Sequence, residues 1–374
     1  MADKRPITTP AALAELTNND SLIAGASAVL SEQGSSPATP ASGYGIVYAK
    51  TDGKLYFKND AGTETDLTAG GGGTDPVIRE YTANDTWTKP TAANFWGVLV
   101  LCVGAGGGGG SGRRGAASSV RGSGGGGSGA AYAYRIMRAA TLTNSSYSIT
   151  IGSGGAGGVA RTTDDTNGLP GANGGATTFG SLVSARFGLG GFSGSTGTST
   201  GSTVGGNLGN CTPAFGPYAA TGGQGGSGNA ASNGGVPGAG LNGTGAAGGG
   251  GGGGIDASNN VRNGGIGGAI YDAGTASANP AAGTTTGNRN GANGSDIANN
   301  ILFDINNSTT AAMGTGGGGG AAGDTAGTIA GGNGGNGGKG AGGGGGGAST
   351  NGANSGAGGD GGGGLCFVVE YYGA

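Results

Sequence analysis

The chain has 374 residues, of which 102 are glycine and 11 are proline, and it carries 17 Lys and Arg against 20 Asp and Glu. Collagen is excluded because it needs glycine at every third position and abundant proline, and runs such as Gly250–Gly254 break that register. The balanced charge predicts no nucleic-acid partner. The sequence contains no histidine, which excludes Ser-His-Asp and Cys-His catalysis within this chain.

The N-terminal residues 1–33 are rich in alanine and weakly helical in pattern. Thr9 is placed to cap a short helix, and Ser21–Gln33 is a second, weaker helical stretch. The segment has no adjoining apolar stretch of the kind that a signal peptide needs. The best apolar run in the chain, Phe95–Val103, has only the length of a strand. We therefore expect neither a signal peptide nor a membrane-spanning segment.

Residues 34–68 predict a small β module. Apolar and polar residues alternate in Gly45–Lys50 and in Lys54–Asn59, and the short turn between them predicts a hairpin. A third strand is expected at Glu64–Leu67. Because an isolated hairpin is barely stable in water, we expect this module to pair with copies of itself. Residues 69–75 then form a glycine-rich linker.

Residues 76–374 are predicted to form one glycine-rich domain. Its β frame, at residues 76–191 and 365–374, encloses a long insertion at residues 192–364. The expected strands are Val77–Thr82, Asn94–Val103, Ala130–Arg138, Tyr147–Ile151, a short hairpin within Thr177–Phe179, Leu182–Val183 and Arg186–Leu189, and finally Leu365–Tyr372. We expect the last strand to pair with Val98–Val103, which would close the frame around the insertion.

The tripeptide Gly-Gly-X recurs in phase within this domain, as in GGNGGNGGKGAGG at Gly331–Gly343. A period of three fits neither an α-helix nor a β-strand, but it fits a polyproline-II-type helix with about 3.1 Å rise per residue. Glycine keeps its N–H group, so such helices can bond to neighbours on several sides. The X side chains, here Asn333, Asn336 and Lys339, would then point outward. The composition also suits a flexible linker, but the alternation of these tracts with strand-like segments favours order.

The chemistry of the remaining residues predicts no enzyme, no cofactor and no metal site. The three cysteines, Cys102, Cys211 and Cys366, are odd in number and widely spaced, so we expect reduced, buried thiols. No pair of carboxylates lies on an evident catalytic loop. Lys339 is followed by glycine, so the phosphate-binding P-loop signature is absent.

The densest group of basic residues is expected to consist of solvated loop charges. Its members are Arg113, Arg114, Arg121, Arg135 and Arg138.

Three polar excursions interrupt the glycine tracts, at Phe192–Tyr218, Ile255–Arg262 and Ala269–Ala312. Loops on a rigid scaffold commonly carry recognition, so these segments supply the candidate receptor contacts. The candidates are Phe215, Tyr218, Tyr271, Asp272, Arg289, Phe303 and Asp304. The alternative is that the aromatic members fill local hydrophobic clusters or subunit contacts.

The order of motifs resembles the glycine-rich domain of tailed-bacteriophage fibre and tip proteins. The matching segments are YTANDTWTKP at Tyr81–Pro90, GAGGGGG at Gly104–Gly110, GSGGGGSGAAY at Gly122–Tyr132, YSITIGSGGAGG at Tyr147–Gly158, GANGGATTFGSLVSARFGLGG at Gly171–Gly191 and GGGGLCFVVEYY at Gly361–Tyr372. The segment PASGYGIVYAKTDGKLYFKNDAGTETDL at Pro40–Leu67 is similar to a short module of phage virion fibres that is typically trimeric.

This resemblance implies a mainly β, homotrimeric virion fibre, made in the host cytoplasm. Residues 1–33 would attach it to other virion proteins, and the glycine-rich domain would bind a bacterial surface glycan or outer-membrane protein without catalysis. An alternative is a head fibre or capsid decoration protein with a structural role. A more remote alternative is an ice-binding protein, which would need a flat, regular face of small residues that the varied X positions do not supply.

Overall fold

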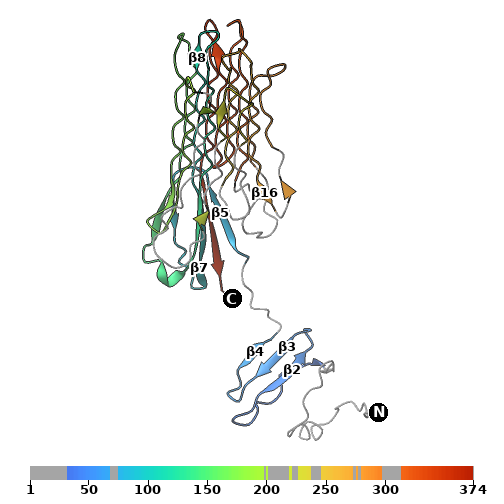
Figure 1. Cartoon of the computed structure of the whole chain (residues 1–374). Helices are drawn as coiled ribbons and strands as arrows, with labels where there is room; N and C mark the ends of the chain where they lie inside the picture. The colour runs from blue at the N-terminus through green and yellow to red at the C-terminus, as the bar shows by residue number, and fades with distance from the viewer. Residues whose placement is uncertain are drawn as a thin grey trace, which may run out of the picture. The chain divides into compact units, whose positions relative to one another are not determined.

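The computed structural model describes residues 32–67, 75–197, 199–200, 219–220, 226–236, 246–272, 275–276, 279–296 and 313–373. The chain divides into two compact units, residues 1–72 and 73–374. It is mainly β, and the described residues contain no α-helix (Figure 1). None of these residues forms a helix long and apolar enough to cross a membrane. The helix predicted from Thr9 lies outside the described residues, as does most of the one predicted at Ser21–Gln33.

The first unit contains a four-stranded sheet in the order β1-β2-β3-β4. Its strands are β1 (Glu32–Gln33), β2 (Ile46–Lys50), β3 (Leu55–Lys58) and β4 (Glu64–Asp66). The hairpin and the third strand lie where the alternating pattern predicts them. The end of the second predicted helix is wrong, because Glu32 and Gln33 pair in parallel with the end of β2 and so complete the sheet.

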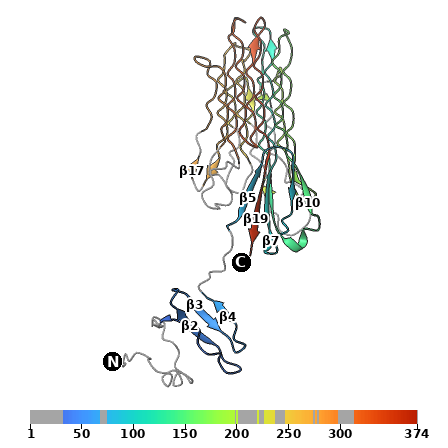
Figure 2. The same cartoon turned by 180° about the vertical axis from the view of Figure 1, so that it is seen from behind.

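The second unit contains two sheets, which together form its β frame. The five-stranded sheet has the order β14-β9-β7-β19-β5, and the four-stranded sheet has the order β12-β11-β10-β6 (Figure 2). The strands are β5 (Val77–Tyr81), β6 (Asp85–Thr88), β7 (Phe95–Val103), β9 (Tyr132–Arg138), β10 (Ser146–Thr150), β11 (Thr177–Phe179), β12 (Val183–Ala185), β14 (Ala219–Ala220) and β19 (Leu365–Tyr372), with a 3-10 turn at Ala139–Thr141.

The predicted closure of the frame is confirmed. The terminal strand β19 pairs antiparallel with β7, with Leu365 opposite Val103 and Phe367 opposite Leu101. Strand β5 pairs with the other edge of β19, so the C-terminal strand lies inside the sheet. The predicted hairpin near residue 180 is confirmed only in outline: its second strand is β12, and Arg186–Leu189 continues into a glycine tract instead.

A side-chain core lies between the two sheets of the frame. It is built around Trp87, whose ring centroid lies 5.6 Å from that of Phe179 and 6.1 Å from that of Tyr147. Trp87 belongs to β6, a strand that the sequence pattern did not predict because polar residues surround it. The opposite face of the large sheet packs Leu101 and Phe367 against alanines at the ends of the glycine tracts.

Three further pairs of short strands and several isolated bridges complete the regular structure of the described residues. Residues of the turns and tracts form β8 (Arg114–Gly115) with β18 (Ser349–Thr350), β13 (Ser199–Thr200) with β15 (Gly228–Asn229), and β16 (Tyr271–Asp272) with β17 (Thr275–Ala276). Isolated bridges add Arg121 to Ile255 and Asp296 to Gly314, among others.

The remaining described segments form what we call the glycine lattice, a set of extended tracts joined by backbone hydrogen bonds. Its tracts are residues 104–114, 121–131, 151–160, 166–175, 186–195, 226–229, 234–236, 246–255, 261–270, 280–285, 289–296, 313–323, 331–338, 341–349 and 355–364. They run side by side from the frame, where β5 and β7 lie, to the opposite end, where β8 lies (Figure 1). The lattice therefore begins well before residue 192.

The hydrogen bonds of the lattice repeat every three residues. In tract 104–114, the N–H of Gly107 donates to Ser128 and that of Gly110 donates to Gly125, at 3.0 and 2.8 Å. The two residues between them donate to two other tracts, so that the N–H groups of this tract serve three antiparallel neighbours in rotation. Its carbonyls accept from three parallel neighbours in the same rotation.

Tract 104–114 is therefore enclosed on all sides. It donates to tracts 121–131, 166–175 and 355–364, and it accepts from tracts 151–160, 186–195 and 341–349. Tract 341–349 also has six hydrogen-bonded neighbours among the described residues. Buried backbone groups need such partners, and here neighbouring tracts supply them without a conventional sheet.

Close approach of backbones explains why these tracts consist of glycine. A Cβ atom placed on Gly109 would lie 2.0 Å from the carbonyl oxygen of Gly344, and one on Gly362 would lie 1.7 Å from that of Gly338. Most described tract glycines meet a neighbouring backbone in the same way. Gly363 is an exception. A Cβ atom placed on it would lie 3.9 Å from the nearest atom, because its tract faces open space there.

Candidate functional site

Five of the turns that join tracts at the end of the lattice away from the frame form the candidate site, which we call the turn end. It comprises residues 115–120, 161–166, 256–260, 324–329 and 350–353. Three of these turns contain a non-glycine residue in the left-handed region, with φ of 59° at Ser118, 52° at Asp165 and 66° at Asn259. This backbone conformation is unfavourable for a residue with a Cβ atom, so it persists only where the surrounding structure fixes it. Residues of this kind are often found in ligand-binding loops.

Arg121 joins three of these turns. Its side chain is fully buried and donates to Thr350 Oγ1 at 2.7 Å and to Asn259 Oδ1 at 2.6 Å. It also donates to the carbonyl oxygens of Ser119 and Asp256. Burial lowers the pKa of Arg121, and the negative charge of Asp256 opposes that effect. Because Arg remains protonated, a buried cation here requires all these acceptors.

Arg114 and two aspartates connect the turn at residues 161–166 to two of these turns. Arg114 donates to Asp164 at 2.6 Å and to the carbonyl of Thr162 at 2.6 Å. Asp164 also accepts from the N–H of Gly352, and Asp165 accepts from the N–H of Ala116. Each carboxylate thus bonds to a neighbouring turn, which couples the positions of the turns.

The turn at residues 324–329 is tied to the same network. Thr350 donates through Oγ1 to the carbonyl of Asp324 at 2.8 Å. Burial of the Asp324 carboxyl opposes its ionisation, but hydrogen bonds from Thr328 and from backbone N–H groups outweigh burial and lower its pKa. The ionised carboxylate therefore fixes this turn.

The expectation that the basic residues are solvated is wrong for three of the five. Arg113 and Arg114 are only 9% and 8% exposed, and Arg121 is not exposed at all. The reason is geometric, because these residues stand where tracts end. Arg114 and Arg121 donate to carbonyl oxygens of the turns, and Arg113 donates to the side-chain oxygen of Asn167. Arg138 is exposed as expected, and Arg135 is half-buried.

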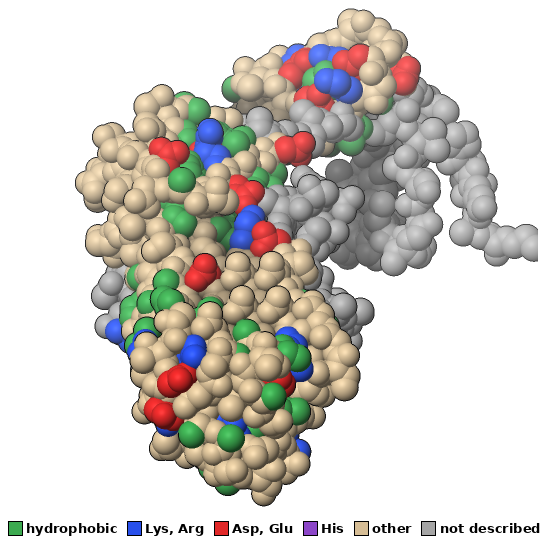
Figure 3. Space-filling model, turned by 90° about the horizontal axis from the view of Figure 1, so that it is seen from above, with side chains coloured by type: hydrophobic (Ala, Val, Ile, Leu, Met, Phe, Trp, Pro, Cys, Tyr) green, Lys and Arg blue, Asp and Glu red, His purple; other side chains and the backbone are tan. Residues whose placement is uncertain are grey.

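The exposed atoms of the turn end are mainly those of small polar side chains. Ser118, Thr162, Thr163, Ser258 and Thr325 are exposed, together with the carboxylates of the 161–166 turn. Seen from this end of the second unit, uncharged polar side chains and backbone cover most of the surface, with acidic and basic groups scattered among them (Figure 3). Hydroxyls, amides and carboxylates on fixed turns are suited to hydrogen-bond polar ligands such as sugars.

The structure does not bring together the candidate residues that it describes. Four of them, Phe215, Tyr218, Phe303 and Asp304, lie outside the described residues. Tyr271 and Asp272 form β16, which follows Ile270, a residue packed beside the frame.

Arg289 lies toward the other end of the lattice from β16. It donates through Nη1 to the carbonyl of Ala322, and its own carbonyl accepts from Ala321 at 2.8 Å. The tract carrying Ala322 begins beside the frame at Met313 and ends at the turn end. Arg289 therefore has a structural role that sequence reasoning did not foresee. Of the three predicted excursions, only Ile255–Arg262 is described throughout, and it supplies one of the five turns.

The X residues of the Gly-Gly-X repeats terminate the lattice at its surface. The predicted outward positions of Asn333 and Asn336 are confirmed, since both are exposed, whereas Lys339 is half-buried and pairs with Glu80 at 2.9 Å. Their side-chain oxygens accept from the backbone N–H groups of Ala357 and Asp360, each at 2.9 Å. In turn, the N–H of Asn333 donates to the side chain of Asn290. These amides take the place of a missing neighbouring tract.

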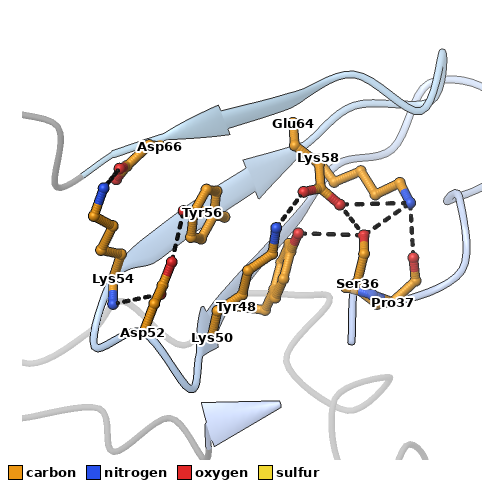
Figure 4. Close-up of polar contacts among 10 residues, drawn as sticks. All are labelled: Ser36, Pro37, Tyr48, Lys50, Asp52, Lys54, Tyr56, Lys58, Glu64 and Asp66. Atoms are coloured by element: carbon orange, nitrogen blue, oxygen red, sulfur yellow. Dashed lines mark hydrogen bonds and ion pairs between the residues drawn. The ribbon is translucent and has the colours of Figure 1, made fainter. Parts of the chain in front are cut away.

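The first unit carries a separate polar cluster on one face of its sheet (Figure 4). Tyr48 and Tyr56 stack with ring centroids 5.9 Å apart, and Lys50 Nζ lies 4.1 Å from the Tyr56 centroid. Glu64 pairs with Lys50 at 2.5 Å and accepts from Ser36. These groups satisfy one another, so the cluster is a structural one and offers no evident reactive group.

No protein-family model matches the chain, and no curated protein is significantly similar to it. Among the described residues, no group of three or more His, Cys, Asp or Glu side chains is placed to hold a metal ion.

Proposed function

We propose that this chain is a virion fibre protein of a tailed bacteriophage, and that its turn end binds a bacterial surface glycan or outer-membrane protein without catalysis. The observation that supports this most is the set of turns fixed by Arg114, Arg121 and their partners at the end of a rigid lattice. Fixed polar turns lose little entropy on binding, which is how a non-enzymatic attachment surface gains affinity. The order of glycine-rich motifs supports the phage assignment.

We also infer that the tracts are polyglycine-II helices. Three features support this: the three-residue repeat of the hydrogen bonds, the six neighbours of tracts 104–114 and 341–349, and the lack of room for Cβ atoms. A three-residue repeat is the geometry of a helix with three residues per turn. Fibre diffraction or vibrational spectra of the isolated protein would test the assignment.

The homotrimer remains part of the proposal, and an apolar face of the first unit supports self-association. Val47 and Phe57 are cross-strand partners on the face opposite the Tyr48 cluster, and they are 48% and 37% exposed. Leu67 is 48% exposed as well. A sheet of this size gains stability by covering such a face. Light scattering of the full chain at several concentrations would give its mass, and a monomer would refute the trimer.

Electron microscopy of intact virions tests the location. Gold-labelled antibodies against residues 76–374 are expected at the tail end. Label over the head would favour the alternative, a head fibre or capsid decoration protein, and the absence of label from all particles would refute the virion assignment.

Binding of the fluorescent full chain to host cells tests the site. Replacing Ala117 and Ser258 by arginine places bulk on two exposed turns and is expected to reduce cell binding at least about tenfold, since hot-spot contacts are lost. Replacing Val236, which is 66% exposed outside these turns, by arginine is the matched control. Equal binding by both variants and the unaltered chain would exclude the turn end as the attachment surface.

A further inference from the structure

Two cysteines that are far apart in the sequence face each other in the β frame. Cys102 of β7 is directly opposite Cys366 of β19, and their sulfur atoms lie 3.6 Å apart. Both side chains are completely buried in the core between the two sheets. The sequence gives no local sign of this pair, because 263 residues separate the two cysteines, and the described ones among them include the lattice and further strands of the frame.

The geometry of the pair is compatible with a covalent bond. Directly opposite residues of antiparallel strands have Cα atoms about 4.5–5.5 Å apart, which lies within the range that disulfides accept. A disulfide needs its sulfurs about 2.05 Å apart, so small side-chain rotations must bring these two closer. The neighbouring side chains Val100 and Val368 belong to the same packed cluster and hold both strands in register.

We propose that Cys102 and Cys366 are an oxidation site, at which a cross-strand disulfide locks the first and last strands of the glycine-rich domain together. The bond closes a loop that contains almost the whole lattice. Closing so long a loop strongly reduces the conformational entropy of the unfolded chain. The bond also keeps β19 attached to β7 when the domain unfolds.

The oxidant is a small disulfide such as oxidised glutathione. One cysteine thiolate attacks it, forming a mixed disulfide and releasing one glutathione thiolate. The second cysteine thiolate then attacks the protein sulfur of the mixed disulfide and releases the other glutathione. Two protein thiols are oxidised, one glutathione disulfide is reduced, and the two thiol protons pass to the glutathione thiolates. Because both thiols are buried, the reaction occurs while β19 is undocked, during folding or opening of the frame.

The test uses the full chain with Cys211→Ser, which removes the third cysteine. The protein is refolded with oxidised or with reduced glutathione, and its intact mass and tryptic peptides are measured without reduction. We expect the oxidised sample to be lighter by two hydrogen atoms, with the peptide of Cys102 linked to that of Cys366. We also expect its folding equilibrium constant to exceed that of the reduced sample about a hundredfold.

Cys366→Ser in the same background supplies the control. It is expected to fold and to show the same stability after either treatment. The proposal is overturned if the oxidised sample retains two titratable thiols after denaturation, if glutathione stays attached to either cysteine, or if the linked protein is no more stable than the reduced one.

Discussion

The β frame and the glycine lattice are both well packed, but different parts of the chain fill their interiors. The frame buries side chains: Trp87, Tyr147 and Phe179 form an aromatic cluster between two sheets. The lattice buries backbone: each enclosed tract directs its N–H and C=O groups at six neighbours, and most of its glycines leave no space for even one carbon more. Burial of apolar area stabilises the first, and dense hydrogen bonding stabilises the second.

This difference implies different responses to mutation. A side-chain core relaxes partly around a cavity, so its losses are graded. In the lattice, an added Cβ atom meets a backbone that is hydrogen-bonded to further backbones, and no rotamer change relieves the contact. Glycine also loses much conformational entropy on folding, so a lattice is stable only when nearly all its bonds form together.

The largest effect is expected for Gly109→Ala, in the enclosed tract 104–114. Its Cβ would lie 2.0 Å from the carbonyl oxygen of Gly344 and 2.5 Å from the carbonyl carbon. We expect a loss of at least about 4 kcal/mol in the free energy of unfolding, because both tracts are fixed by hydrogen bonds on all sides. Chemical denaturation followed by circular dichroism measures it.

Gly363→Ala is the matched control for this prediction. Its Cβ would lie 3.9 Å from the nearest atom, the carbonyl oxygen of Gly152. We expect a change within about 0.5 kcal/mol. Similar losses for the two variants would show that glycine is needed for its flexibility and not for close packing.

A smaller effect is expected in the frame from Leu101→Ala. Leu101 is 1% exposed and faces Phe367 across β7 and β19. Removing three carbon atoms leaves a cavity, and we expect a loss of about 3 kcal/mol, with the variant still folded. Leu101→Met, which conserves volume, is expected to cost less than about 1.5 kcal/mol. Unfolding of Leu101→Ala without denaturant would contradict the graded response.

The same contrast explains what the sequence predicts well. Nearly continuous apolar runs identify β7 and β19 and favour their pairing, because both faces of these strands are buried. Strand β6 escapes this rule, since Trp87 is its only buried residue. The Gly-Gly-X period indicates a lattice, but it does not show which tracts lie next to one another. The neighbours of each tract depend on the course of the whole chain, which no local sequence pattern specifies.

The candidate site was harder to predict for a related reason. Its turns are separated by up to 235 positions, from residue 115 to residue 350, and they meet only because the tracts have matching lengths. Arg121 looked like an ordinary loop cation. Burial of its guanidinium follows from Thr350 and Asn259, neither of which is near it in sequence. An arginine placed where a glycine tract ends is the one signal that the sequence offered.

A charged group inside the frame makes stability depend on pH. Glu370 is buried and accepts from Arg79, from Trp87 Nε1 at 2.8 Å and from Tyr372 at 2.8 Å. Burial opposes its ionisation, but these hydrogen bonds outweigh burial and lower its pKa below the ordinary value of 4.5. Its contribution is therefore fully present above the unfolded pKa and is lost as the pH falls through the lower folded pKa.

We expect Glu370→Gln to cost about 2 kcal/mol at pH 7, because charged hydrogen bonds become neutral ones. The difference between this variant and the unaltered chain should shrink as the pH falls below 4.5. Thermal unfolding at several pH values measures both effects. A difference that grows toward acidic pH would mean that the folded state raises the pKa of Glu370 instead.

The smallest effect is expected at the surface of the lattice, where side chains take over the role of backbone. Asn333→Ala removes the oxygen that accepts from the N–H of Ala357 at 2.9 Å. Because the position is exposed, water can replace that acceptor, and we expect a loss of no more than about 1 kcal/mol. Asn333→Asp keeps an acceptor oxygen and should lose less. If Asn333→Ala instead destabilised the domain as much as Gly109→Ala, the surface amides would be as essential to the lattice as its glycines. The proposed boundary between a rigid interior and a tolerant surface would then have to be abandoned.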